Sequence, residues 1–230
     1  EFYSERWLVL PDDYICFLPI PTAPPVSPSP ALANGFVTFG SFNNPAKLSD
    51  DTLALWCRVL HAVPDSRLLL AYRGFDDPQI QRGIRSGLQT SGIAPERVDF
   101  KTFTYHEEFL GGYGLMDIAL DSMPYSGGLT TCEALWMGVP VISLATQSHF
   151  AGRHSVSHLS NAGYPHWAVE TADDFVALGI DMASDLPRLA RTRQALRQTV
   201  SLSPLCDQER YARGVDEQLS ATWTDFCRGL

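Results

Sequence analysis

The chain has 230 residues, of which 45% are hydrophobic and 11% aromatic. This composition supports a sizeable folded core and excludes an intrinsically disordered chain. The formal net charge of −9 excludes the basic surface with which a protein recruits nucleic acid or an anionic membrane, so we expect neither as a partner.

The first 34 residues precede the regular part of the chain. Residues 1–20 contain two short apolar runs, which cannot form a core of their own. Residues 21–34 are rich in proline and predict a stiff, extended linker. Because the chain begins with Glu1 rather than methionine, we expect it to be part of a longer protein.

Strand and helix patterns alternate over residues 35–200. Apolar strand patterns occupy residues 36–42, 67–72, 97–100, 116–120, 139–144 and 166–169. Helix patterns between them begin at the capping residue Ser49 and cover 78–92, 106–113, 130–138 and 151–161. The alternation predicts an α/β fold with a doubly wound parallel sheet covered on both faces. Further helices are predicted over 172–183, 187–200 and 207–226, the last within a C-terminal extension covering 201–230.

Conspicuous polar residues follow the predicted strands. The carboxyl ends of parallel strands share one edge of the sheet, and ligands bind there near the switch in strand order. The sequence therefore predicts one ligand site at this edge. Its candidates are Asn43, Asn44, Lys47, Tyr72, Arg73, 104–106 and 126–133.

The segment 125–133 carries Gly127 and Gly128 immediately before a predicted helix. A glycine loop at a helix start directs several backbone N–H groups at one point, which favours a phosphate-bearing ligand. The alternative is a capping box, in which Thr130 and Glu133 satisfy those N–H groups themselves. The spacing is compatible with both, and a glycine loop alone is a weak signal.

Three more residues have two interpretations each. Lys47 is one of only two lysines and either faces the glycine loop or lies in solvent. His106 either contacts a ligand or caps its own helix. Glu133 either holds ribose hydroxyls or remains in the capping box.

Other conspicuous side chains predict structure rather than chemistry. His154 and His158 have the spacing of a metal pair, but no third ligand is evident, which favours polar packing and no metal. Trp56, Trp136 and Trp223 lie on apolar helix faces and are predicted to be core. The five cysteines form no C-x-x-C pair, which predicts reduced thiols and a cytoplasmic protein.

Four segments of the chain resemble the protein O-linked N-acetylglucosamine transferases, particularly the bacterial members that follow tetratricopeptide repeats. They are GFVTFGSFNNPAK at 35–47, DIALD at 117–121, YSGGLTTCEALWMGVP at 125–140 and SPLCD at 203–207. The resemblance implies the C-terminal, donor-binding half of a GT-B glycosyltransferase, with a Rossmann-like domain over 35–200. Residues 1–20 would then be the trailing edge of the N-terminal catalytic lobe.

The resemblance also implies an activity. The parent protein would be an inverting enzyme that transfers N-acetylglucosamine from UDP-N-acetylglucosamine to serine and threonine hydroxyls of proteins, with no metal or other cofactor. The partners implied are the UDP-sugar, a protein or peptide acceptor, the missing lobe and a repeat domain. Since the family's proposed base histidines lie in that lobe, we expect this chain to bind UDP without transferring sugar.

Individual site residues follow from the same resemblance. Lys47 matches the lysine that contacts the diphosphate and stabilises its departure, which makes it the catalytic candidate. The other implied contacts are Asn44 beside Lys47, His106 beside uracil, Gly127, Gly128, Thr130 and Thr131 at the phosphates, and Glu133 at the ribose. Phe109 and Leu129 also belong to the site, but other members of the family have histidine there, which predicts looser nucleotide selectivity.

Two other functions remain open from the sequence. A UDP-N-acetylglucosamine 2-epimerase shares this architecture and a similar Ser-Gly-Gly-Leu loop. Against it, the loop continues as Thr-Thr-Cys-Glu, and the Arg-Pro-Glu motif of the epimerases is absent. The third possibility is a UDP-sugar-binding module without catalytic activity.

Overall fold

The computed structural model describes residues 4, 7–145 and 149–229. A six-stranded parallel sheet has the order β3-β2-β1-β4-β5-β6, so the strand order reverses between β1 and β4. The strands are β1 Thr38–Ser41, β2 Arg67–Ala71, β3 Val98–Lys101, β4 Ile118–Leu120, β5 Val141–Leu144 and β6 Ala168–Val169. The predicted doubly wound α/β fold is confirmed.

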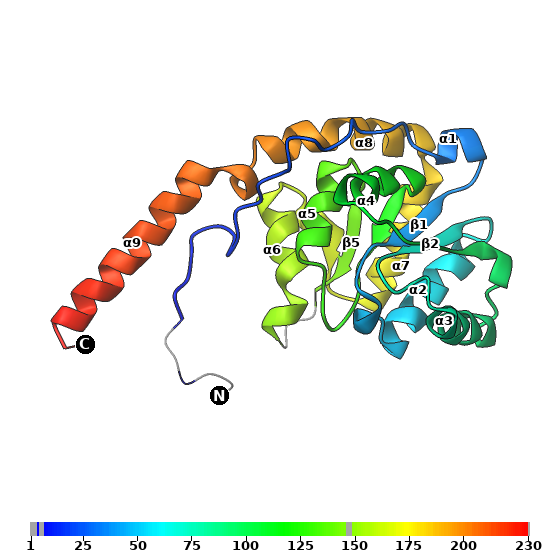
Figure 1. Cartoon of the computed structure of the whole chain (residues 1–230), viewed down its shortest axis with the longest axis horizontal. Coiled ribbons are helices and arrows are strands. Elements are labelled where there is room, and N and C mark those ends of the chain that lie inside the picture. Colours follow the sequence, from blue (N-terminus) through cyan, green and yellow to red (C-terminus); the bar gives the residue numbers. More distant parts are fainter. Residues whose placement is uncertain (1–3, 5–6, 146–148, 230) are drawn as a thin grey trace.

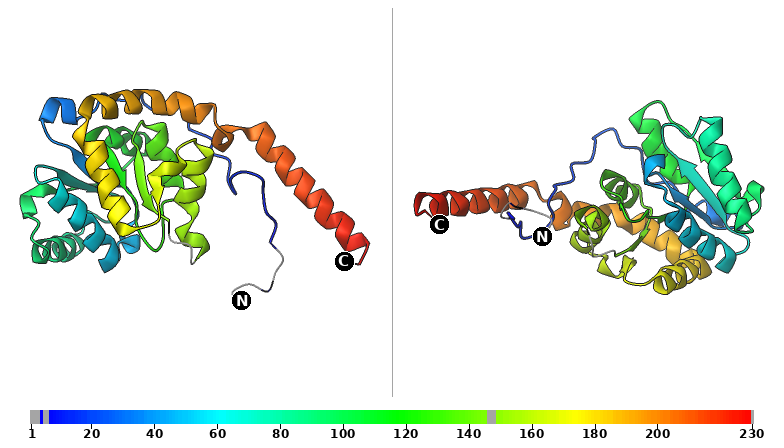
Figure 2. Two further views of the ribbon diagram at one scale, coloured as in Figure 1. Left: turned by 180° about the vertical axis from the view of Figure 1, so that it is seen from behind. Right: turned by 90° about the horizontal axis from the view of Figure 1, so that it is seen from below.

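Helices cover both faces of the sheet (Figure 1). The α-helices are α1 Ala31–Asn34, α2 Asp50–Ala62, α3 Pro78–Thr90, α4 His106–Gly112, α5 Leu129–Trp136, α6 His154–Asn161, α7 Ala172–Ser184, α8 Leu186–Ser201 and α9 Gln208–Cys227. Helix α2 packs against both α3 and α7, while α5 packs between β5, α6 and α8. Figure 2 shows α9 projecting away from the layered domain, on the same side as the N-terminal segment.

Local sequence signals explain several helix ends. The hydroxyl of Ser49 accepts from Thr52 N–H at the start of α2, and Asp77 accepts from Gln79 N–H at the start of α3. Gly138 follows α5 with a φ of 80°, which glycine adopts without the steric cost of a Cβ atom. These predicted boundaries are confirmed.

The three tryptophans predicted to be core differ in how deeply they are buried. Trp56 is fully buried in the core and Trp136 is partly buried against it, as predicted. The prediction for Trp223 is wrong, because 66% of this residue is exposed. It lies on the projecting part of α9, where no second layer of the described chain covers an apolar helix face.

The proline-rich segment is held against the domain by Arg193 of α8. Its guanidinium donates to the carbonyl and hydroxyl oxygens of Ser27 and to the carbonyls of Tyr113 and Met116, at 2.8–3.0 Å. Burial lowers the pKa of Arg193 to about 10, and nearby Asp117 opposes that shift. One buried cation therefore joins the segment, α8 and the start of β4.

Among the described residues, no helix has the length and apolar character required to cross a membrane.

Replacing this cation tests how far the domain depends on it. Arg193→Met keeps most of the side-chain volume but leaves the buried carbonyl groups without donors, so it should lower the free energy of unfolding by at least roughly 3 kcal/mol. Urea denaturation gives the measurement. Arg191→Met, at an exposed position of the same helix, is the matched control and should change stability by less than about 0.5 kcal/mol. Equal losses in the two variants would contradict the anchoring role.

Candidate functional site

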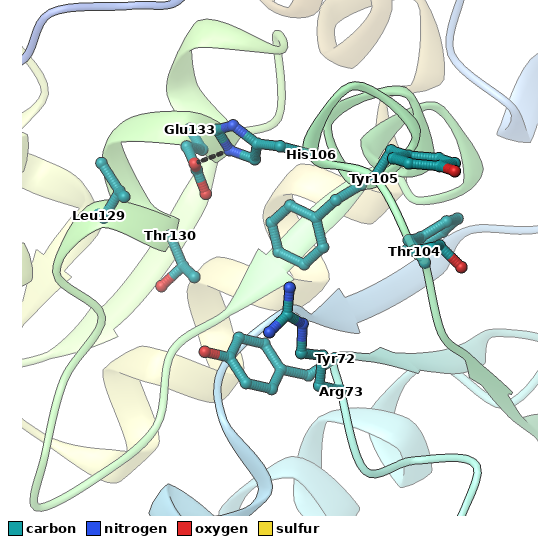
Figure 3. A pocket seen from close by; sticks show the side chains of 10 residues that line it. Tyr72, Arg73, Thr104, Tyr105, His106, Leu129, Thr130 and Glu133 are labelled. Carbon is teal, nitrogen blue, oxygen red and sulfur yellow. Dashed lines mark hydrogen bonds and ion pairs between the residues drawn. The ribbon is translucent and has the colours of Figure 1, made fainter.

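A cleft lies at the carboxyl ends of the strands, where the strand order reverses. Its first part is a pocket of about 370 Å³ between the ends of β2 and β3 and the start of α5. Figure 3 shows Tyr72 and Arg73 facing His106 and Glu133 across this pocket. A second part of about 280 Å³ continues past the shared residues Tyr72, Leu129 and Thr130 to Lys47. The predicted position of the ligand site therefore coincides with this cleft.

The buried carboxylate of Asp121 organises the loop between β4 and α5. Its Oδ1 accepts from Gly127 N–H at 2.7 Å and from Ser122 N–H at 2.9 Å. Its Oδ2 accepts from the Ser143 hydroxyl at 2.7 Å. The loop packs so tightly here that a Cβ on Gly127 would lie 2.3 Å from Thr131 Oγ1. Glycine is thus required at this point by close approach, and Asp121 fixes the loop before the helix begins.

The start of α5 differs from the predicted capping box. Gly128 is the N-cap and supplies no side chain, while Thr130 instead donates to Asn43 Oδ1 at 2.8 Å. The capping-box interpretation is wrong because both of its side chains have tertiary partners. Among the described residues, the backbone N–H groups of Leu129 and Thr130 have no hydrogen-bond partner, and both residues line the cleft. Unpaired donors at a helix start are suited to an anion.

The two predicted threonines have different surroundings. Thr130 lines both parts of the cleft. Thr131 is buried, its hydroxyl lies 2.8 Å from Ser155 Oγ, and its backbone N–H donates to Gly128 O. Of the pair, only Thr130 therefore presents its side chain to the cleft. Gly127 is likewise buried and contributes by shaping the loop, while Gly128 lines the part near Lys47.

Lys47 faces the glycine loop, as predicted. Its Nζ donates to the carbonyl of Ser126 at 2.9 Å and lies 4.0 Å from the centroid of the Tyr125 ring. Burial lowers the pKa of Lys47, while the negative charge of Asp121 raises it and so limits the shift. Asn44 lines the cleft next to Lys47, with its side chain accepting from Ala46 N–H. A partly desolvated cation and two unpaired backbone donors thus line the same part of the cleft.

His106 and Glu133 form a pair at the other end. His106 Nε2 lies 2.6 Å from Glu133 Oε1, and Glu133 is only 4% exposed. Burial raises the pKa of Glu133, and the hydrogen bond with His106 partly offsets this rise. His106 thus contacts the carboxylate instead of capping its own helix. Both residues line the pocket.

The two predicted positions that lack a polar side chain also line the pocket. Phe109 packs against Phe42, Tyr113 and His106, with ring centroids 5.1, 5.7 and 6.2 Å away. Leu129 is 57% exposed and belongs to both parts of the cleft. The pocket wall is therefore aromatic at Phe109 and apolar at Leu129.

The structure adds residues that sequence reasoning did not assign to the site. The part of the cleft near Lys47 is also lined by Tyr14, Tyr125 and His154. The buried Asp121 holds the adjacent glycine loop through its hydrogen bond from Gly127 N–H. Tyr14 had no local signal, because it reaches the cleft from a segment far away in the sequence. His154 and His158 have tyrosine and aspartate partners, and the described part of the chain contains no group of residues suited to holding a metal ion.

Comparison with known proteins shows that the chain is similar to glycosyltransferases. The model of glycosyl transferase family 41 matches residues 28–215. A relative from Arabidopsis thaliana, named probable UDP-N-acetylglucosamine–peptide N-acetylglucosaminyltransferase SPINDLY, is 40% identical over 226 residues. That match covers 98% of this chain and 25% of the relative. A UDP-N-acetylglucosamine–peptide N-acetylglucosaminyltransferase from Caenorhabditis elegans is 27% identical, over 86% of this chain and 17% of its own length.

Solved structures give the same fold. An O-GlcNAc transferase mutant from Thermobaculum terrenum has a TM-score of 0.87 and 31% identity, over 96% of this chain and 41% of its own. Sucrose-phosphate synthase from Thermosynechococcus elongatus, at 19% identity and a TM-score of 0.62, shares the fold over 91% of this chain and 52% of its own. The chain spans about a quarter of the length of the SPINDLY relatives it matches.

The raised pKa of Glu133 predicts a dependence of stability on pH. A carboxyl whose pKa is higher in the folded state costs stability above that pKa, and the cost disappears below the unfolded value. Glu133→Gln keeps an acceptor for His106 without the charge. It should therefore be more stable than the unmodified chain at about pH 7 and equally stable at about pH 4.

Urea denaturation at the two pH values measures this difference. Glu217→Gln, on the exposed surface of α9, is the matched control and should stay within about 0.5 kcal/mol of the unmodified chain at both. A Glu133→Gln variant that is less stable at neutral pH would show that the charged pair with His106 outweighs the burial cost.

Proposed function

The chain belongs to glycosyl transferase family 41, and on that premise we propose that its cleft binds the UDP-sugar donor of a protein N-acetylglucosaminyltransferase. One observation carries the proposal. Lys47 and the unpaired N–H groups at the start of α5 line the same part of the cleft, and a diphosphate would satisfy both. The names of the relatives from Arabidopsis and Caenorhabditis support UDP-N-acetylglucosamine as the donor.

The two parts of the cleft match the two ends of a nucleoside diphosphate. The pocket beside Phe109 and His106 offers aromatic surface for a base, and Glu133 at its inner wall offers a carboxylate to ribose hydroxyls. The part at Lys47 offers positive charge to the phosphates. Leu129 and Thr130 lie where the two parts meet, next to the link between ribose and phosphate.

Lys47 has a chemical role as well as a binding role in this proposal. When the bond from the sugar to the diphosphate breaks, negative charge develops on the departing phosphate oxygen. A fixed ammonium group and backbone N–H groups stabilise that charge most strongly where water is excluded. They supply the positive charge that a metal would otherwise provide, so we propose that transfer needs no cofactor.

Transfer to serine and threonine hydroxyls of proteins is proposed for the longer protein. The chain spans about a quarter of its relatives, and the cleft contains no residue to which we assign the role of general base. We therefore propose that these residues bind the donor without transferring sugar by themselves. The relatives' names favour a transferase over an epimerase. A cytoplasmic location belongs to the same proposal.

Lys47→Ala tests the diphosphate contact. Loss of a charge-assisted hydrogen bond costs roughly 1.5–3 kcal/mol, which corresponds to about 10- to 150-fold weaker UDP binding. Uridine lacks phosphates and should bind the two proteins alike. Lys47→Arg should recover only part of the loss, because a planar guanidinium replaces a point charge poorly.

Titration calorimetry with UDP and uridine measures these affinities. Lys101→Ala is the matched control, because it removes the chain's other lysine from an exposed position at the end of β3. The control should leave UDP affinity within about twofold. A Lys47→Ala variant that also stays within this range would place Lys47 outside the donor site.

The apolar positions Phe109 and Leu129 predict loose discrimination among bases. At these two positions the pocket wall offers no polar contact that one base satisfies and another does not, so UDP, CDP and GDP should compete within about tenfold of one another. Competition titrations against a fluorescent UDP analogue measure the ranking. Strong selection of UDP would contradict loose discrimination, and strong selection of GDP would overturn the choice of UDP as the nucleotide.

A further inference from the structure

The cleft continues beyond Lys47 as a row of aromatic side chains. Tyr125 lies beside the Lys47 ammonium, and its ring centroid is 5.6 Å from that of His154. Tyr14 completes the row, with its hydroxyl 2.7 Å from His154 Nδ1. Tyr14 and His154 line the part of the cleft near Lys47, and neither lines the pocket beside Phe109.

The order of groups in a sugar nucleotide decides what would reach this row. Base, ribose, diphosphate and sugar are joined in a line. With the base in the pocket beside Phe109 and the diphosphate at Lys47, the sugar is directed towards Tyr125 and His154. The row therefore contacts a part of the donor that the free nucleoside diphosphate lacks.

The contact with Tyr14 determines what His154 can offer. Burial, with a smaller contribution from Asp13, raises the pKa of Tyr14 to about 12, so its hydroxyl keeps a proton to donate. Burial, His158 and Lys47 lower the pKa of His154, which favours the neutral ring. A neutral imidazole that accepts at Nδ1 carries its own proton on Nε2. Among the described residues, Nε2 of His154 has no hydrogen-bond partner.

Tyr14 is fixed by contacts of its own carbonyl and of the two residues before it. The neighbouring Asp13 lies 2.7 Å from His158 Nδ1, and both side chains are at most 1% exposed. The carbonyl of Tyr14 accepts from the Tyr211 hydroxyl at 3.1 Å, and Arg210 forms two hydrogen bonds with Asp12. The hydroxyl of Tyr14 is thus presented to His154 by a rigid support.

We propose that His154 contacts the donor sugar as a hydrogen-bond donor through Nε2, and that Tyr14 is the positioning residue that sets the tautomer of its ring. This inference rests on the proposed function of the cleft. It assigns to α6 and the N-terminal segment a part in distinguishing the sugar nucleotide from the nucleotide that remains after transfer.

The test compares the affinity of the 230-residue chain for UDP-N-acetylglucosamine with its affinity for UDP. His154→Ala should weaken binding of the sugar nucleotide about three- to tenfold, as expected for one neutral hydrogen bond, and leave UDP within about twofold. His154→Gln retains an N–H near the position of Nε2 and should restore most of the loss. Tyr14→Phe should cause a smaller loss, and no further loss when combined with His154→Ala.

Three results would overturn the inference. His154→Ala could leave both affinities unchanged, it could weaken both equally, or Tyr14→Phe could add its full effect in the absence of His154. His166→Gln is the matched control, because His166 lies just before β6, at the amino ends of the strands and away from the cleft. It should change neither affinity. If the unmodified chain binds UDP and the sugar nucleotide but His154→Ala does not separate them, only this inference fails. If the unmodified chain binds no nucleotide, the proposed function fails with it.

Discussion

The hydrogen bonds of the Asp121 carboxylate hold the cleft together. Asp121 follows the central strand β4, and its acceptors join the glycine loop to Ser143 of β5. The Asn43 amide, 3.4 Å from Asp121 Oδ1, connects this centre to the Thr130 hydroxyl on α5. A buried carboxylate is stable only when its oxygens are satisfied. The hydrogen bonds to these oxygens therefore fix the loop and the start of α5 in one arrangement. The Lys47 ammonium is held against that loop by its hydrogen bond to the Ser126 carbonyl.

Two charged groups of the cleft are kept where burial disfavours their charge. Desolvation lowers the pKa of Lys47 and raises that of Glu133. Such groups reduce the stability of the isolated protein, and they are typical of sites where a ligand completes the electrostatic balance. Glu133 lines one part of the cleft and Lys47 lines the other, as the proposed ligand, with ribose hydroxyls and phosphates, requires. The energetic cost and the geometry therefore support the same proposal.

The N-terminal segment is part of this arrangement. Asp13 pairs with His158 of α6, and the carbonyl of Pro24 accepts from Arg197 of α8 at 2.7 Å. Such contacts between distant parts of the chain bring Tyr14 to the edge of the cleft. Residues 21–34 are predicted to be a linker between domains, and several of their polar groups bond to α8. A proline-rich segment with little regular structure is thus held against the domain by hydrogen bonds from Arg193 and Arg197 of α8.

The sequence by itself determined the strands, the helices and their parallel arrangement. These follow from local periodicity and from capping residues such as Ser49 and Asp77, whose partners are two or three positions away. It also placed Lys47 opposite the glycine loop, because residues after neighbouring parallel strands share one edge.

Only the tertiary structure decided between alternatives that depend on distant partners. Glu133 could complete a capping box with Thr130, but in the fold its carboxylate lies 2.6 Å from Nε2 of His106, which is 27 positions away. The pairing of Tyr14 with His154 spans 140 positions, and no local pattern encodes it. Trp223 has a helical pattern typical of core, yet α9 leaves the domain. A side chain's partner depends on which elements pack together, and that information is distributed over the whole chain.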